Sequence, residues 1–319
     1  MNLRTAESVS PRHPDKICDQ ISDSILDAAL KVDPNSRVAI ETVGGHKLLV
    51  LIGEITTEAK IDYEKIARRF VDDSYEVRVQ IVHQSPEIAG GVDTGGAGDQ
   101  GIMVGYATNE TENLIPLEVD LSRSLNRYLY AKFPYDGKTQ ITISDGKIIA
   151  IVASFQNAKK ADLEDLINSW ISTQPHKPNF DVFANPAGDW DIGGFDADTG
   201  LTGRKIAIDS YGPRIPIGGG AFSGKDSTKV DRSAAYVARK IAVDYLKKHN
   251  ASEVYCQLAY AIGVAEPVEA IVTIDGNEEK VEGYDLTPKG IIEFLELQKP
   301  QFEVTAQYGH FGNSFGWDV

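Results

Sequence analysis

One segment, GGGAFSGKDSTKVDRS at positions 218–233, combines the residue types that bind phosphate groups. Glycines in a turn allow backbone N–H groups to crowd around an anion, and Lys225 and Lys229 supply positive charge. Asp226 and Asp231 are carboxylates that could hold a divalent cation against the same phosphate oxygens. The segment therefore predicts a polyphosphate–Mg²⁺ site. Taken alone, it is equally consistent with a glycine-rich surface loop followed by a solvated basic helix.

The same segment comes close to the P-loop pattern, G-x-x-x-x-G-K-[ST]. Gly219, Gly224 and Lys225 fit this pattern, but Asp226 stands where a Mg²⁺-binding hydroxyl belongs. No strongly apolar strand leads directly into the loop, because Tyr211–Arg214 intervenes. The match is therefore incomplete, and a P-loop-like kinase or nucleotidase is the weaker of the enzyme hypotheses.

Further short motifs place functional side chains at turns or at the start of a helix, namely His13–Lys16, Gly96–Gly101, Tyr135–Lys138 and Thr202–Lys205. The first begins a predicted helix, whose positive end favours phosphate and metal, although a simple N-terminal cap would look the same. Each of the others could be an exposed turn. The chain contains no Gly-x-Ser-x-Gly, paired-cysteine zinc or His-Glu-x-x-His motif. This inventory fits a reaction that needs positive charge and Mg²⁺ but no protein nucleophile.

The charge distribution favours a small anionic ligand over a macromolecular polyanion. The chain of 319 residues has a formal net charge of -15, which argues against nucleic acid or an anionic membrane as the main partner. Between positions 200 and 240, however, eight Lys or Arg face three Asp. Cys18 and Cys256 lie far apart outside any CxxC pattern, and the N-terminus lacks an apolar signal core. We therefore expect a soluble, cytoplasmic protein.

The apolar spacing predicts an α+β protein with much antiparallel pairing, in which strands joined by hairpins are covered by helices. A helix from Pro14 to about Lys31 should bury Ile17, Ile21, Ile25 and Ala29. The other predicted helices are 63–73, 121–132, 162–171, 229–248 and 288–297. The predicted strands are 37–43, 48–56, 77–84, 102–107, a hairpin over 139–155, 204–209, 254–263 and 269–275.

These elements recur in three sets, which suggests three similar subdomains with a pseudo-three-fold arrangement. We expect an N-terminal domain at 1–88, a central domain at 89–193 and a C-terminal domain at 194–319. The central domain would begin with a short loop, 89–98, that is rich in glycine.

Taken in order, the motifs resemble the S-adenosylmethionine synthetase (methionine adenosyltransferase) family. Two blocks, GAGDQG at 96–101 and GGGAFSGKD at 218–226, are highly specific to it. The other matching segments are Glu7–Ser10, His13–Lys16, Gly53–Thr57, Tyr106–Thr111, Gly200–Lys205, Tyr260–Pro267 and Tyr308–Gly312. The chain is identified as a shortened member, because the stretch between Gln84 and Gly98, the family's gating loop, is trimmed and has lost most of its bulk to glycine.

The resemblance implies that methionine sulfur attacks C5′ of ATP and expels tripolyphosphate, which is then hydrolysed to pyrophosphate and phosphate. It implies two Mg²⁺ per site, a K⁺ ion, and a homodimer with shared active sites that possibly pairs into a homotetramer. The short loop leaves a catalytically silent ATP- or methionine-binding module as an alternative of a different class. Because no proposed catalytic side chain is missing, we expect an active enzyme.

The resemblance also implies roles for individual residues. The catalytic set is His13, Lys138, Arg204 and Lys225. ATP would contact these four and Asp136, Trp190, Asp198, Lys205 and Ala221. Methionine would lie near Glu54, Gln84, Asp99, Asp198, Lys229 and Ile262. Asp15 and Asp231 would bind Mg²⁺, and Glu41 would bind K⁺.

Overall fold

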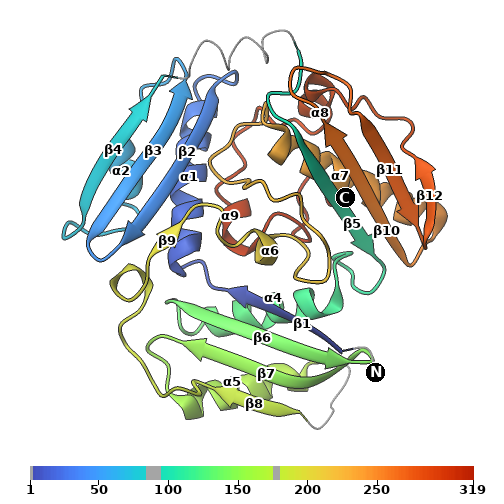
Figure 1. The fold of residues 1–319 in the computed structure, drawn as a ribbon. Helices are drawn as coiled ribbons and strands as arrows, with labels where there is room; N and C mark the ends of the chain where they lie inside the picture. Colours follow the sequence, from blue (N-terminus) through green and yellow to red (C-terminus); the bar gives the residue numbers. More distant parts are fainter. Residues whose placement is uncertain (1–2, 84–94, 175–179) are drawn as a thin grey trace.

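Three four-stranded sheets surround a centre of loops and short helices (Figure 1). The computed structural model describes residues 3–83, 95–174 and 180–319. The first sheet contains β4 (Glu76–Val82), β3 (Leu48–Thr56), β2 (Arg37–Gly45) and β9 (Gly200–Leu201). The second contains β1 (Leu3–Val9), β6 (Gly137–Ser144), β7 (Lys147–Phe155) and β8 (Asp181–Ala184). The third contains β12 (Asn277–Lys280), β11 (Glu269–Ile274), β10 (Glu253–Tyr260) and β5 (Gly101–Thr108).

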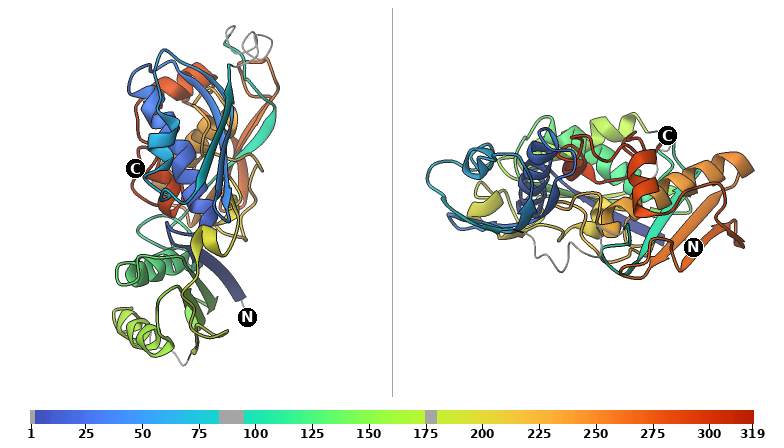
Figure 2. Two further views of the ribbon diagram at one scale, coloured as in Figure 1. Left: turned by 90° about the vertical axis from the view of Figure 1, so that its left-hand side faces the viewer. Right: turned by 90° about the horizontal axis from the view of Figure 1, so that it is seen from above.

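Helices cover each sheet on one side only. The helices are α1 (Pro14–Leu30) and α2 (Tyr63–Ala67) on the first sheet, α4 (Leu117–Tyr130) and α5 (Lys160–Ser172) on the second, and α7 (Val230–His249) and α8 (Pro288–Phe294) on the third. Shorter ones are η1 (Gly194–Asp196), α6 (Ile206–Asp209) and α9 (Thr305–Tyr308). Seen from the side, the molecule is flattened, with helices along one side and strands along the other (Figure 2). The predicted α+β class with three similar units is confirmed.

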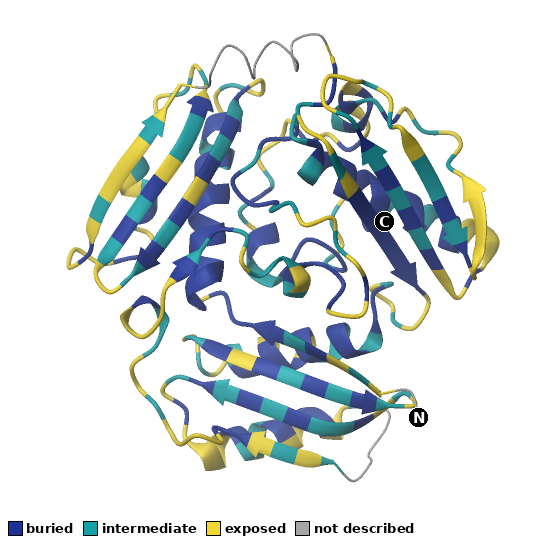
Figure 3. Ribbon diagram, viewed as in Figure 1, coloured by how far each residue is buried: buried dark blue, intermediate teal, exposed yellow. Residues whose placement is uncertain are grey.

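The alternation of side chains along the strands explains this one-sided arrangement. In β2, Val38 and Ile40 are buried beneath α1, whereas Ala39 and Glu41 face the other way. A similar alternation occurs in β6 and β7 of the second sheet and in β10 of the third (Figure 3). On α1, the predicted stripe of Ile17, Ile21, Ile25 and Ala29 is fully or almost fully buried, as the spacing requires.

Each sheet contains a strand that comes from a distant part of the sequence. β1 pairs with β6 of the second sheet, β5 pairs with β10 of the third, and β9 pairs with β2 of the first. Each sheet therefore mixes residues from different thirds of the chain, and the domain boundaries at 88 and 193 stay a prediction. This arrangement brings β9 and the turn after it to the start of α1.

One predicted element is wrong. Residues 204–209, expected as a strand, form a turn followed by the short helix α6. The Lys16 ammonium binds the Asp209 carboxylate at 2.7 Å, and Arg123 donates to the carbonyls of Ile208 and Ser210. These contacts come from α1 and α4, so the local alternation of Ile and Ala could not reveal them.

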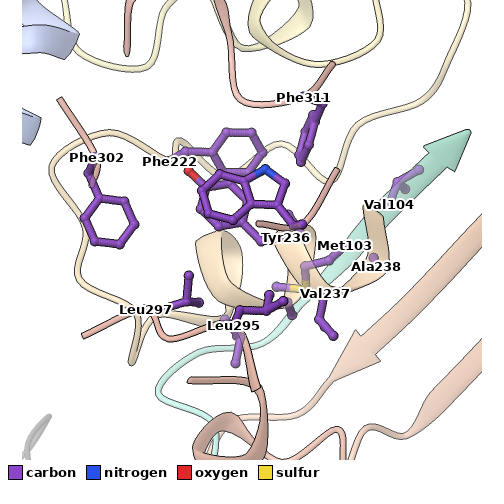
Figure 4. Packing of buried hydrophobic residues seen from close by; sticks show 14 of the residues in the cluster. Met103, Val104, Phe222, Tyr236, Val237, Ala238, Leu295, Leu297, Phe302 and Phe311 are labelled. Atoms are coloured by element: carbon purple, nitrogen blue, oxygen red, sulfur yellow. The ribbon is translucent and has the colours of Figure 1, made fainter. Parts of the chain in front are cut away.

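Aromatic side chains from α7, the glycine-rich loop and the C-terminal segment pack together in the core. Tyr236 stacks on Trp317 with ring centroids 3.9 Å apart, and Phe222 and Phe311 pack against Tyr236 (Figure 4). Within the described ranges, none of the helices is long and apolar enough to cross a membrane.

Candidate active site

His13 caps the N-terminus of α1 in its neutral form. Its Nδ1 accepts a hydrogen bond from the backbone N–H of Asp15 at 3.2 Å, and Pro14 occupies the first turn. Burial and the nearby Lys205 lower the pKa of His13 to about 4. At neutral pH its single proton therefore lies on Nε2, because Nδ1 acts as an acceptor. The ring offers one N–H donor to a ligand.

Asp15 holds two basic side chains at the same helix end. Its fully buried carboxylate accepts hydrogen bonds from the Leu201 N–H at 3.0 Å and from the Lys205 ammonium, and it forms an ion pair with Arg204 Nε at 2.9 Å. Burial acts to raise the pKa of Asp15, but these hydrogen bonds and charges hold it below its usual value. The carboxylate therefore stays ionised and fixes Arg204 and Lys205 beside His13.

Residues from the second sheet stand close to His13. The positive charge of Lys138, at the start of β6, helps to lower the pKa of His13, and the negative charge of Asp198, which precedes β9, opposes this. Asp136 Oδ2 accepts from the Gly194 N–H at 3.0 Å, and burial raises the pKa of Asp136 to about 6. Trp190 lies beside Gly193, where an added Cβ would come within 2.7 Å of the indole ring.

The glycine-rich loop carries a second charged group. Lys225 Nζ lies 2.6 Å from Asp231 Oδ2 at the beginning of α7. Gly220 passes so close to Asp231 that an added Cβ would lie 2.3 Å from the carboxylate. Among the described residues, the backbone N–H groups of 219–221 have no hydrogen-bond acceptor. These groups are available to an anionic ligand.

The charged residues around Asp15 and those of the glycine-rich loop come together where this loop crosses the turn after β9. An added Cβ at Gly203 would lie 2.4 Å from Cβ of Ala221, so the backbones of the two segments touch. Gly203 has a φ of +79°, which favours glycine at this contact. His13, Asp15, Arg204 and Lys205 thus adjoin the loop that bears Lys225 and leads to Asp231.

Asp226 has a structural role, which corrects the suggestion that it binds a cation. Its buried carboxylate accepts from the N–H groups of Val38 at 2.7 Å and Thr228 at 2.9 Å, and from the Lys229 ammonium. Residues 224–226 extend along β2, since Ala39 and Lys225 form an antiparallel bridge. In a P-loop, a strand leads directly into the loop and the loop into a helix. Here the loop is instead attached through Asp226 to β2, which is distant in the sequence.

The remaining predicted residues are spread over the molecule. Glu41 and Glu54 lie on the face of the first sheet that no helix covers. Asp99 and Ile262 are exposed near the start of β5, where Ala97 exchanges backbone hydrogen bonds with Gly263 and Val264. Lys229 is bound to Asp226. Gln84 and residues 89–94 of the predicted gating loop lie outside the described residues.

Comparison with known proteins gives matches along almost the whole chain. Three S-adenosylmethionine synthetase domain models match consecutive segments: the N-terminal domain at 1–89, the central domain at 94–190 and the C-terminal domain at 192–319. The chain belongs to the S-adenosylmethionine synthetase family. It is thereby placed among the ATP-dependent enzymes that transfer an adenosyl group to methionine.

Two curated relatives in this family match almost from end to end. S-adenosylmethionine synthase of Mesoplasma florum is 43% identical over 365 aligned positions, which cover 99% of this chain and 97% of the relative. The enzyme of the same name from Brachyspira hyodysenteriae is 42% identical, covering 98% and 95%. Because the first alignment is longer than the 319 residues of this chain, that relative carries segments that this chain lacks.

The family depends on a divalent metal and a monovalent cation, and the carboxylates here fit the first of these. Asp15 and Asp231 each offer one carboxylate beside basic side chains. No group of three or more His, Cys, Asp or Glu in the described ranges could hold a metal by itself. That donor set suits Mg²⁺, which takes one or two protein carboxylates and completes its shell with phosphate and water.

Sequence reasoning missed the buried charges that support this site. Asp19 accepts from the Gly203 N–H at 2.8 Å, and Asp23 pairs with Arg232 at 2.7 Å. Their only signal in the sequence is a carboxylate at every fourth position of α1, beginning with Asp15 and ending with Asp27. A stripe of carboxylates on an amphipathic helix ordinarily indicates a solvated face, so the sequence alone does not indicate that these side chains are buried.

Proposed function

We propose that this chain forms S-adenosylmethionine from ATP and L-methionine, with sulfur attacking C5′ and tripolyphosphate leaving. The proposal rests chiefly on one observation: the group around His13 and Asp15 adjoins the loop bearing Lys225 and Asp231. A thioether has no proton to lose, so the first step requires no general base. Its main barrier is the charge that develops on the leaving tripolyphosphate, which positioned basic side chains stabilise. Tripolyphosphate is then hydrolysed to pyrophosphate and phosphate.

The side chains divide into those that act on phosphate and those that hold the nucleoside. Neutral His13 would donate Nε2–H to the oxygen that bridges C5′ and the phosphates. Lys138, Arg204, Lys205 and Lys225 would bind the phosphates. Asp136, Trp190, Asp198 and Ala221 would contact the nucleotide, with Trp190 against adenine. Its half-buried ring beside Gly193 supports this assignment.

The metal and methionine assignments complete the proposal. Asp15 and Asp231 would each hold one Mg²⁺, whose charge offsets that of the phosphates, and Glu41 would hold K⁺. Methionine would lie near Glu54, Asp99, Asp198, Lys229 and Ile262, together with Gln84. In the structure Asp15 pairs with Arg204 and Lys205. These two basic side chains would therefore turn toward the phosphates when ATP binds.

We further propose a homodimer with shared active sites; a tetramer would be a pair of such dimers. Glu41 and Glu54 share the uncovered face of the first sheet with the apolar side chains of Ala39, Val43, Leu48, Val50 and Ile52. Ile52 is 46% exposed in the single chain. An uncovered sheet face with this composition favours pairing with a second copy, which would bring methionine and K⁺ ligands of one subunit to the phosphate group of the other.

The direct test is to incubate the purified protein with ATP, L-methionine, Mg²⁺ and K⁺. S-adenosylmethionine is followed by mass, and tripolyphosphate, pyrophosphate and phosphate are separated. The expected result is S-adenosylmethionine with equal amounts of pyrophosphate and phosphate. Accumulated tripolyphosphate would contradict the hydrolytic step alone. Binding of ATP and methionine without S-adenosylmethionine would favour a silent binding module, and phosphate release without methionine would favour a kinase-like nucleotidase.

A further inference from the structure

Helix α1 carries a carboxylate at every fourth residue, and each one accepts backbone N–H groups from a distant segment. Four residues make slightly more than one helical turn, so Asp15, Asp19, Asp23 and Asp27 lie along one face. Asp15 accepts from Leu201 at 3.0 Å and Asp19 from Gly203 at 2.8 Å. Asp23 accepts from Gly224 at 2.8 Å, and Asp27 accepts from Gln301, Phe302 and Glu303 at 2.9–3.0 Å.

Asp15 and Asp19, the first two of these aspartates, fix the turn that bears Arg204 and Lys205. Asp19 is buried, and its other oxygen accepts from the Lys16 ammonium at 3.0 Å. Thr202, between the two bonded N–H groups, is anchored to α1 through the Ser22 hydroxyl at 2.8 Å. Residues 201–203 therefore lie against three successive turns of α1, and the direction in which Arg204 and Lys205 leave the turn follows from these contacts.

Asp23 fixes the backbone of Lys225. The Asp23 carboxylate and the Arg232 guanidinium are fully buried and form a pair of bonds at 2.7 and 3.0 Å. Arg232 also donates to the Lys225 carbonyl at 3.0 Å, while Asp23 accepts from the preceding N–H, that of Gly224. On its other side Gly224 accepts from Ile40 of β2 at 3.0 Å. The peptide that carries Lys225 is thus held from α1, α7 and β2 at once.

We propose that Asp19 and Asp23 are positioning residues for the phosphate-binding cations: Asp19 for Arg204 and Lys205, and Asp23, with Arg232, for Lys225. This inference rests on the proposed function. Neither carboxylate needs to touch the substrate. Each sets the place of a loop whose side chains stabilise tripolyphosphate, and a displacement of about 1 Å in such groups is enough to lower turnover strongly.

The same molecule supplies a matched control for each residue. Asp27 resembles Asp19, since it lies on the same face of α1 and accepts backbone N–H groups, but it holds residues 301–303 away from the site. Asp318 resembles Asp23, since it pairs with a buried arginine of α7, Arg239, at 2.9 Å and accepts from the Gly312 N–H. Loss of either control should lower stability without moving Lys225 or Arg204.

The experiment compares Asp19→Asn and Asp23→Asn with Asp27→Asn and Asp318→Asn. Three quantities are measured: the free energy of unfolding in urea, kcat and KM for S-adenosylmethionine formation, and the affinity for tripolyphosphate with Mg²⁺ by calorimetry. All four variants should be less stable. Asp19→Asn and Asp23→Asn should lower kcat, and the affinity for tripolyphosphate, by about tenfold or more. The two controls should keep both within about twofold.

The inference is overturned if folded Asp19→Asn and Asp23→Asn proteins keep kcat and tripolyphosphate affinity, or if the controls lose as much. Should Asp23→Asn fail to fold, Arg232→Lys keeps the charge beside Asp23 but loses the rigid guanidinium fork that binds Asp23 and the Lys225 carbonyl together. It should bind tripolyphosphate more weakly, and unchanged binding would count against the inference. A parent protein that makes no S-adenosylmethionine would instead refute the proposed function, while calorimetry with tripolyphosphate would still test the positioning.

Discussion

Lys225 is the basic side chain whose contribution can be isolated most cleanly. Its ammonium is partly exposed and bonds to Asp231, whereas its backbone is fixed by β2, α1 and α7. Its charge can therefore be removed without disturbing the fold. Arg204 and Lys205 share the carboxylate of Asp15, so removing either one alters the pairing of the other.

Lys225→Ala should lower kcat for S-adenosylmethionine formation by about a hundredfold, because one positioned charge on the leaving tripolyphosphate is lost. The midpoint of thermal unfolding should stay nearly unchanged. The measurement is steady-state kinetics with a melting curve for the same preparation. Lys289→Ala, at a side chain that is 81% exposed, serves as the control. Near-parental turnover in Lys225→Ala would remove this residue from the catalytic set.

Asp136 gives a prediction for pH. Burial raises its pKa from 3.8 to about 6, so the folded protein binds this proton more tightly than the unfolded chain does. The stabilisation that this proton gives to the folded protein is complete below pH 3.8, and it is lost as the pH rises through 6. Relative to the parent, Asp136→Asn should therefore gain about 1–2 kcal/mol of stability between pH 5.0 and 7.5. Urea unfolding at both pH values measures this difference, and a pH-independent difference would show that Asp136 does not titrate as described.

At the scale of elements, close approaches of the backbone decide where the charged loops lie. Gly203 and Gly220 stand at two such points, against Ala221 and Asp231. Helix α1 passes Gly203 at Asp19, in its second turn, and α7 begins beside Gly220. Both helices thus present a carboxylate, Asp15 or Asp231, in their first turn.

Gly220→Ala should damage the Asp231 side of the site. The new methyl group would lie 2.3 Å from the carboxylate, so either Asp231 or the loop must shift. We expect tripolyphosphate binding in the presence of Mg²⁺ to weaken by about tenfold or more, as measured by calorimetry. Gly316→Ala is the matched control, since an added Cβ there meets no atom within 4 Å. Equal binding by the two variants would mean that Asp231 tolerates displacement.

At the scale of the whole molecule, the three sheets leave one broad face without helices (Figures 2 and 3). On the first sheet this face carries both apolar side chains and the proposed K⁺ and methionine ligands. If the active site is shared between two subunits, association and activity must be lost together.

Ile52→Asp tests this coupling. A charge at the centre of the uncovered face should oppose contact with a second copy, because burying an unpaired carboxylate is unfavourable. Light scattering should show a monomer, and S-adenosylmethionine formation should fall with the dimer fraction. Val32→Asp, at a 65% exposed position after α1, should leave both unchanged. A fully active Ile52→Asp monomer would contradict the shared site.

Much of this protein was determined by its sequence alone. The spacing of Ile17, Ile21, Ile25 and Ala29 predicted α1, and alternating residues predicted β2, β3, β6 and β7, because local periodicity sets which face is buried. Residue types also predicted phosphate binding by 218–233, which stays a prediction, whereas the contact of this loop with the turn at 202–205 is seen only in the fold. The family followed from the order of the motifs.

Tertiary structure alone decided the rest. Residues 204–209 are not a strand, because Lys16 and Arg123 bind them from two other elements. The carboxylate of Asp226 is taken up by the Val38 N–H of β2 and by Thr228 and Lys229 of its own segment. The aspartates of α1 look like a solvated stripe until the segments at 201–203, 224 and 301–303 cover them. Each of these outcomes depends on hydrogen bonds between residues far apart in the chain, and periodicity along the chain carries no information about such partners.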